Sequence, residues 1–263
     1  MDDTGAGGES MPRRELGRCG FADGERYQAG RPDYPPAALD YLARSLGLDG
    51  VSRVLDLGAG TGILTRQLVE RFPDVTAVEP SEGMRSVLAA ALESVRVSDG
   101  CDTAIPVADH SISAVFVAQA FHWFDAPRAL REIHRVLVPG GGLALLWNDR
   151  DESVDWVAAL SRAMRWDVCR PYSGDVDYAR ILAAGPFISI ARRQFRHRQI
   201  VDRQGLYARV LSTSYIAIMD EDERRDVMAD VAAVVEELPE PIVFPYVTEV
   251  YRASARRAAD ATA

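Results

Sequence analysis

The sequence contains no lysine, so all thirty of its basic residues are arginine. Several chemistries depend on a lysine: P-loop NTPases bind phosphate with one, pyridoxal phosphate enzymes form a Schiff base with one, and protein kinases hold ATP with one. The lysine of the Tyr/Lys pair of short-chain dehydrogenases is missing as well. The composition therefore excludes these four classes of enzyme.

Cysteine is scarce: the chain has Cys19, Cys101 and Cys169. Their odd number and the absence of C-x-x-C spacing argue against a disulfide framework and a zinc site, so we expect reduced thiols and no metal. No apolar run approaches the roughly eighteen residues of a membrane span, and the first residues are polar and glycine-rich, unlike a secretory signal. We therefore expect a soluble, cytoplasmic protein, monomeric or homodimeric, with no membrane partner.

Excess positive charge is absent too, since the net charge is -9 and the isoelectric point is near 5.0. This balance argues against an extended basic face for nucleic acid, although a local patch could escape a whole-chain average. The candidate patch is a run of four arginines at positions 192, 193, 196 and 198, around His197. A solvated strand or loop is the favoured interpretation of that run over a nucleic-acid site, so we expect no nucleic-acid partner.

Strand and helix patterns alternate along the first part of the chain. A helix at 35–46 comes first, with Pro35 and Pro36 where a helix start tolerates missing N–H groups. Regular alternation implies parallel strands joined by crossover helices, hence a doubly wound α/β sheet. The expected strands are 53–57, 74–79, 114–119 and 143–147, the expected helices are 61–72, 81–92 (with Ser81 as N-cap) and 126–137, and a turn is expected at 139–142.

The alternation breaks after Asn148 into helical, aromatic-containing sequence, which is a candidate substrate cap. A strand near 189–200, helices between 204 and 238 and a strand at 241–251 follow, and we expect a single domain. The expected divisions are a disordered tail at 1–12, an N-terminal lid at 13–50, a cofactor-binding core at 51–149, a helical cap insertion at 150–185, the rest of the core with inserted helices at 186–252, and a tail at 253–263.

A glycine loop follows the first expected strand, with the sequence Asp56-Leu57-Gly58-Ala59-Gly60-Thr61-Gly62. Glycine lets a backbone turn sharply and approach a ligand closely. The dinucleotide fingerprint is G-x-G-x-x-G, whereas the spacing here is G-x-G-x-G and Ile63 follows. Asp56 also puts an anion where a pyrophosphate would lie. The loop therefore favours a cationic ligand over a nicotinamide dinucleotide, and S-adenosylmethionine, with its ammonium and sulfonium, fits.

Glu79 ends the second expected strand, nineteen residues beyond Gly60. A carboxylate in this place can accept both hydroxyls of a ribose. The glycine loop and Glu79 together predict a site for a nucleoside-containing cofactor.

The sequence resembles the class I S-adenosylmethionine-dependent methyltransferases, and more narrowly the small-molecule branch of trans-aconitate methyltransferase-like proteins. The resemblance runs through nearly the whole chain. It rests on Tyr27 with residues 31–35, on the loop at 56–62, and on residues 78–84, 119–125 and 137–141.

The resemblance implies a Rossmann-like, seven-stranded, mostly parallel sheet with helices on both faces, an N-terminal helical lid and a helical cap. It also implies S-adenosylmethionine as the cofactor. The residues that would bind it are Tyr27, Arg31, Asp56, Gly58, Gly60, Glu79, Met84 and Gln119.

One loop departs from the pattern. Such families show an acidic loop of the form G-x-A-E-x-L-P after the third strand, and this chain has Gly100-Cys101-Asp102-Thr103-Ala104-Ile105-Pro106. The acid is displaced by one position, so the adenine contact could be the Asp102 side chain, Cys101 or a backbone N–H. We assign Cys101 and Asp102 to the cofactor site.

The expected reaction is methyl transfer to a small-molecule acceptor of specialised metabolism, with a carboxylate or hydroxyl oxygen favoured over sulfur, nitrogen and carbon. His122 is the candidate general base for a hydroxyl, although it could equally pack as a wall residue. A protein of this fold that binds the cofactor without transferring methyl, as a cyclase or a binding module, is the alternative. The expected substrate-binding residues are Trp123, Trp147, Tyr172 and Tyr215.

Overall fold

The computed structural model describes residues 30–169 and 176–257. Within these ranges the chain forms one seven-stranded sheet with the strand order β3-β2-β1-β4-β5-β7-β6. Neighbouring strands pair in parallel from β3 to β5, and β7 is antiparallel to both β5 and β6. The strands are β1 (Arg53–Leu57), β2 (Asp74–Val78), β3 (Arg96–Ser98), β4 (Ile112–Ala118), β5 (Leu137–Arg150), β6 (Phe187–Val201) and β7 (Ile242–Ala255). The predicted fold class is confirmed.

Helices cover both faces of this sheet because its strands alternate apolar side chains between two buried cores. On one face, β-strand residues pack against α3 (Pro36–Ser45), α4 (Ile63–Val69) and α5 (Glu82–Ala91). On the other face they pack against α6 (Ala126–Val136) and α9 (Tyr178–Ala184). The predicted helix at 61–72 is thus shorter at both ends, and Ser81 precedes α5 without a capping hydrogen bond from its side chain.

The predicted turn at 139–142 lies inside β5, which begins at Leu137. Gly140 has a positive φ of 82°, and the register against β4 shifts between the pairs Ile112–Leu137 and Ala114–Gly142. The glycines therefore produce a bulge rather than a reversal of the chain, because extended residues continue on both sides. At this same end of the sheet, where Gly142 pairs with Ser254, β7 continues to Ala255, which is three residues into the range expected as a tail.

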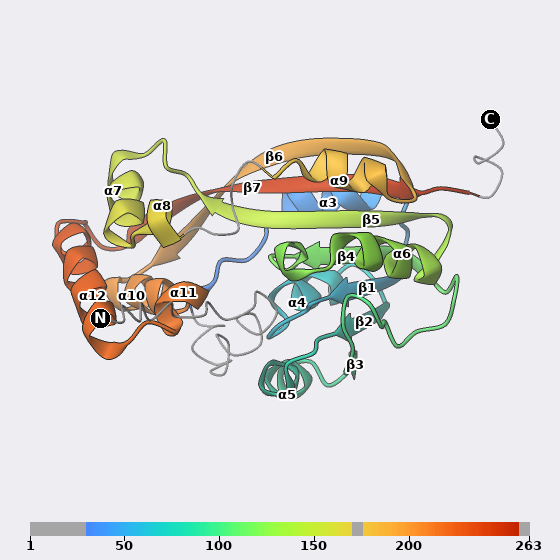
Figure 1. Ribbon diagram of the computed structural model, residues 1–263, viewed down its shortest axis with the longest axis horizontal. Coiled ribbons are helices and arrows are strands. Elements are labelled where there is room, and N and C mark those ends of the chain that lie inside the picture. The colour runs from blue at the N-terminus through green and yellow to red at the C-terminus, as the bar shows by residue number, and fades with distance from the viewer. Residues whose placement is uncertain (1–29, 170–175, 258–263) are drawn as a thin grey trace, which may run out of the picture.

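A third core lies beyond the sheet, where the C-terminal end of β6 and the N-terminal end of β7 meet a group of helices. Figure 1 shows these helices gathered at the end of the molecule toward which β5 runs. They are α7 (Asp155–Ala163), α8 (Trp166–Cys169), α10 (Arg203–Leu211), α11 (Ser214–Ala217) and α12 (Glu221–Val235). The helical unit therefore overhangs the carboxyl ends of the parallel strands, where ligands of open α/β sheets bind.

Only the first part of the range 150–185, which was expected to form a helical cap, lies in the helical unit. Its first helices, α7 and α8, belong to this unit, but α9 packs with Leu182 on the sheet core beside β6. Among the described residues no helix combines the length and apolar character needed to cross a membrane. The range 1–12 lies wholly outside the described residues, and the ranges 13–50, 150–185 and 253–263 lie partly outside them.

Candidate cofactor and acceptor site

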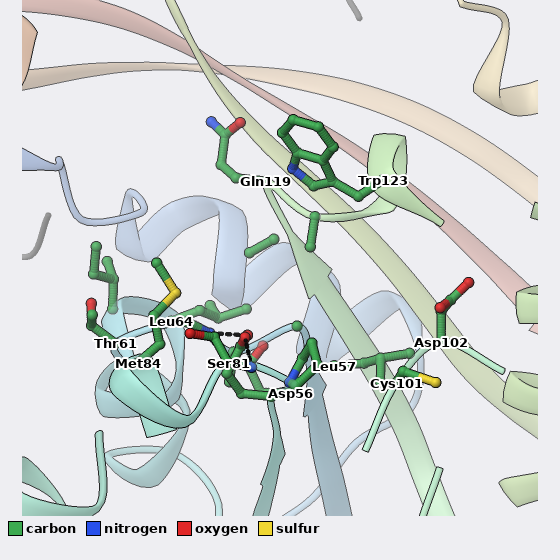
Figure 2. A pocket seen from close by; sticks show the side chains of 18 of the residues that line it. Asp56, Leu57, Thr61, Leu64, Ser81, Met84, Cys101, Asp102, Gln119 and Trp123 are labelled. Atoms are coloured by element: carbon green, nitrogen blue, oxygen red, sulfur yellow. Dashed lines mark hydrogen bonds between the residues drawn. The ribbon is translucent and has the colours of Figure 1, made fainter. Parts of the chain in front are cut away.

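A cavity that opens to solvent lies at the carboxyl ends of β1, β2 and β4. Figure 2 shows Ser81 and Met84 on one side of it and Gln119 and Trp123 on another. Most residues expected to bind the cofactor line this cavity, although they come from four separate segments of the chain. They are Asp56, Gly58, Gly60, Glu79, Met84, Cys101, Asp102 and Gln119.

The glycine loop takes a shape that other residues would strain. Gly58 and Gly62 have positive φ values of 72° and 88°. A Cβ on Gly58 would lie 2.7 Å from the Cβ of Ala120, and one on Gly62 would lie 2.9 Å from the Cγ of Leu88. The spacing G-x-G-x-G therefore lets the loop pass tightly between β4 and α5 and expose its backbone to the cavity.

Glu79 fastens this loop to the end of β2. Its carboxylate accepts a hydrogen bond from the N–H of Gly60 at 2.9 Å and another from the N–H of Ser81 at 2.8 Å. Burial raises the pKa of Glu79, and these two N–H donors and Arg85 oppose that shift. A carboxylate has about four acceptor sites, so Glu79 keeps acceptor capacity for ligand hydroxyls.

Asp56 is the most unusual group in the cavity. Its side chain is buried, one oxygen accepts from the hydroxyl of Thr65 at 2.6 Å, and Oδ1 is buried with no hydrogen-bond partner. Burial and, to a smaller extent, the charge of Glu79 raise the pKa of Asp56 to about 7. An unsatisfied buried carboxylate oxygen is costly, and a ligand that brings a cation or an N–H donor removes that cost.

The loop after β3, whose sequence departs from the family pattern, keeps its acidic residue at the cavity, but this residue also has a structural role. Asp102 accepts a hydrogen bond from the N–H of Asp125 at 2.8 Å, and Asp125 in turn caps α6. Cys101 is a free thiol beside the hydroxyl of Thr103. Both Cys101 and Asp102 line the cavity, so the displaced acid joins this loop to α6 from the cavity wall.

A second cavity adjoins the first, and Gln119 lines both. Gln119 has a positive φ of 53°, and its side-chain amide donates to the carbonyl of Asn148 at 3.1 Å. A small third cavity, lined by Tyr34, Gln119 and Asn148 among others, lies between them. Strained residues of this kind collect at functional sites, and here the hydrogen bond to Asn148 holds the Gln119 side chain at the junction of the two cavities.

The second cavity lies under the helical unit and is rich in charge. Its walls come from the segment before α3, the end of β5, α8 and the end of α10. The lining residues are Arg31, Gln119, Asn148, Asp149, Arg150, Glu152, Trp166, Arg209 and Thr213.

Several predicted site residues lie elsewhere than expected. Arg31 lines the second and third cavities rather than the first, and its guanidinium donates to the carbonyl of Ser212 at 2.8 Å. Trp147 was expected at the acceptor and instead packs in the sheet core, stacked on Tyr178 with ring centroids 4.2 Å apart. Alternation along β5 explains this difference, because Asn148 and not Trp147 faces the cavities.

Tyr215 also lies in a core, that of the helical unit, where its hydroxyl donates to the carbonyl of Met164 at 2.8 Å. Trp123 lines the first cavity, and the ring of His122 lies 4.8 Å from that of Trp123. His122 is not among the described residues that line the three cavities. Tyr27 and Tyr172 lie outside the described residues.

Sequence reasoning missed Arg150, Trp166 and Arg209 as cavity residues. Arg150 follows Asn148 at the end of a strand, which is a signal that could have found it. Arg209 is one of many arginines, and only the packing of α10 reveals that it is buried.

Comparisons with known proteins agree with this geometry. A family model described as a methyltransferase domain matches residues 55–145. An uncharacterized methyltransferase of Mycobacterium tuberculosis is 40% identical over 233 residues, which is 87% of this chain and 92% of the relative. The chain belongs to the class I S-adenosylmethionine-dependent methyltransferases.

Two further comparisons bear on the ligands of this methyltransferase. A malonyl-[acyl-carrier protein] O-methyltransferase of Methylococcus capsulatus is 35% identical over 156 residues, covering 51% of this chain and 56% of the relative. A phosphoethanolamine N-methyltransferase of Haemonchus contortus, solved with S-adenosylhomocysteine, has a TM-score of 0.59 at 14% identity, covering 95% of this chain and 61% of that one. This second likeness shows the fold.

The cofactor of this methyltransferase is S-adenosylmethionine, and the first cavity fits it. The orphaned Oδ1 of buried Asp56 suits a cationic methionine moiety, Glu79 has acceptors for ribose hydroxyls, and Met84 offers an apolar surface. These are the residues that would hold the cofactor.

Proposed function

We propose that this methyltransferase transfers methyl to an oxygen of a small-molecule acid, and that the acceptor binds in the second cavity. The observation that carries the proposal is that Gln119 lines both the cofactor cavity and the second cavity, which is lined by three arginines. Guanidinium groups are the side chains best suited to hold a carboxylate. The name of the Methylococcus relative, an O-methyltransferase, supports oxygen as the acceptor atom.

When bound, S-adenosylmethionine supplies an activated methyl group for in-line displacement. The chain's own part is to hold the acceptor close and aligned, because positioning provides much of the rate of such a transfer. Gln119 and Asn148, whose amides are fixed by backbone and Thr248 contacts, form a rigid wall at the junction. A carboxylate needs no base, which agrees with the absence of His122 from the described lining of the three cavities.

The proposal also favours a small molecule over nucleic acid. The arginine run lies on β6, an edge strand, and three of its four arginine side chains contact partners on the protein. Arg192 pairs with Glu249, Arg196 pairs with Asp151 at 3.0 Å, and Arg193 lies over the ring of Tyr41. These contacts support the interpretation of the run as a solvated strand.

The test is incubation of the protein with methyl-labelled cofactor and a panel of small acids, alcohols, thiols and amines, followed by mass spectrometry. We expect label in an ester that mild alkali hydrolyses back to the acid. Label in an alkali-stable ether would assign a hydroxyl instead, and label on nitrogen or sulfur would contradict the proposal.

A further inference from the structure

Two arginines line the second cavity: Arg150 at the end of β5, and Arg209 on α10 of the helical unit. Arg209 is only 6% exposed, and its guanidinium donates to the hydroxyls of Tyr246 at 3.3 Å and Thr213 at 3.4 Å. Arg150 donates to the hydroxyl of Ser161 at 3.0 Å. All these oxygen acceptors are uncharged.

No carboxylate of the described part of the chain pairs directly with this arginine pair, although the charge of Glu152 acts on Arg150 from a greater distance. Neither Arg150 nor Arg209 has a carboxylate within the 4.0 Å of an ion pair there, and Nη2 of Arg150 is buried without a hydrogen-bond partner. Burial, and next the charge of Arg209, lower the pKa of Arg150 to about 10. Buried like charges without counterions are costly, so an arrangement of this kind is expected where an anion binds.

The acidic residues of the cavity indicate where that anion would lie. Asp149 and Glu152 are exposed, in contrast to Arg209. Their negative charges disfavour an anionic group beside them, whereas the arginine pair attracts one. The acidic side chains of the cavity are thus its exposed ones, whereas the arginine pair extends from half-buried Arg150 to buried Arg209.

We infer that Arg150 and Arg209 form a subsite for a second, non-reacting anionic group of the acceptor, a carboxylate or a phosphate. The inference rests on the proposed function in placing the reacting oxygen near Gln119, which lines both cavities. An acceptor held at both ends is fixed in orientation as well as in place. The arginine pair would therefore determine specificity for acids that carry two anionic groups.

The test measures binding, independently of methyl transfer. The protein, loaded with S-adenosylhomocysteine, is titrated in a calorimeter with straight-chain monocarboxylates, dicarboxylates and ω-phosphono acids of about four to ten carbons. We expect doubly anionic probes of the best-fitting length to bind at least about tenfold more tightly than the monocarboxylate, which corresponds to about 1.4 kcal/mol. The tighter of the two doubly anionic series identifies the group as carboxylate or phosphate.

Variants assign the effect to the arginine pair. Arg150→Met and Arg209→Met should each reduce the preference to less than about threefold while S-adenosylhomocysteine affinity is kept, and Arg209→Gln serves if the methionine variant does not fold. Arg162→Met, which removes an exposed arginine from α7, is the control and should keep the full preference.

Equal binding of singly and doubly charged probes at every length, or a preference that survives both variants, would overturn the inference. A preference that is lost in the variants, together with no methylated product from any acid, would leave the subsite standing and refute the proposed function. The two failures are therefore distinguishable.

Discussion

Cofactor affinity should rise with pH because of Asp56. This carboxyl is buried and its pKa lies at about 7, so below neutral pH it carries a proton. A cationic ligand prefers the ionised form and lowers this pKa when it binds. If only the ionised form binds, each pH unit well below 7 weakens binding about tenfold, and the dissociation constant should fall on the order of twentyfold from pH 5.5 to pH 7.5.

The assay is calorimetric titration with S-adenosylmethionine across this pH range, kept below the titration of the ligand's own amine. Asp56→Asn should flatten the profile because the titrating group is gone. Thr65→Val removes the hydroxyl that donates to Asp56 at 2.6 Å and lowers its pKa, so this variant should move the midpoint to higher pH. A wild-type profile as flat as that of Asp56→Asn would refute the reasoning.

The raised pKa of Asp56 should make the unliganded protein less stable, not more, as the pH rises. The folded state holds the Asp56 proton up to about pH 7, whereas an unfolded chain releases it near its ordinary pKa of 3.8. The folded state therefore binds more protons between these values, and this group's contribution to the unfolding free energy falls as the pH rises through that window. Chemical denaturation at several pH values, compared between wild type and Asp56→Asn, measures it.

Three further substitutions separate binding from stability. Glu79→Ala should weaken cofactor binding by about 1–3 kcal/mol and lower stability, because two backbone N–H donors lose their acceptor. The control is Glu82→Ala on the exposed first turn of α5, which should change neither quantity. An unchanged dissociation constant for Glu79→Ala would contradict the ribose role. Trp147→Ala should destabilise the fold by about 3–5 kcal/mol because its buried ring stacks on Tyr178, and a denaturation curve matching wild type would refute that placement. His122→Ala should lower kcat by far less than the factor of about 10²–10⁴ expected when a general base is lost. A reduction of kcat by that factor would show that His122 is the general base.

The sheet and the cofactor cavity could be predicted from the sequence because both depend on local pattern. The glycine spacing after Asp56 fixes a backbone shape, and Glu79 follows at the end of the next strand, so the two meet at one edge of the sheet. The carboxyl ends of parallel strands always share an edge, which makes such residues predictable without knowledge of the packing.

The acceptor side could not be predicted in the same way. Trp147 and Asn148 are adjacent in sequence, and only the register of β5 decides which of them faces the cavities. Arg209 reaches the cavity through the packing of α10 over the sheet end, a contact between segments distant in sequence. The bulge at Gly140 depends similarly on pairing with β4, because a glycine-rich stretch is compatible with either a turn or an irregular strand.

The central claim is that the methyl group is transferred from the cofactor in the first cavity, near Gln119, to an acid in the second cavity. The most direct measurement is mass spectrometry of small acids incubated with the protein and methyl-labelled S-adenosylmethionine. The account predicts an alkali-labile methyl ester, formed at a rate that Arg209→Met lowers through a raised KM. No labelled ester from any acid, while the protein binds the cofactor and is folded, would contradict it.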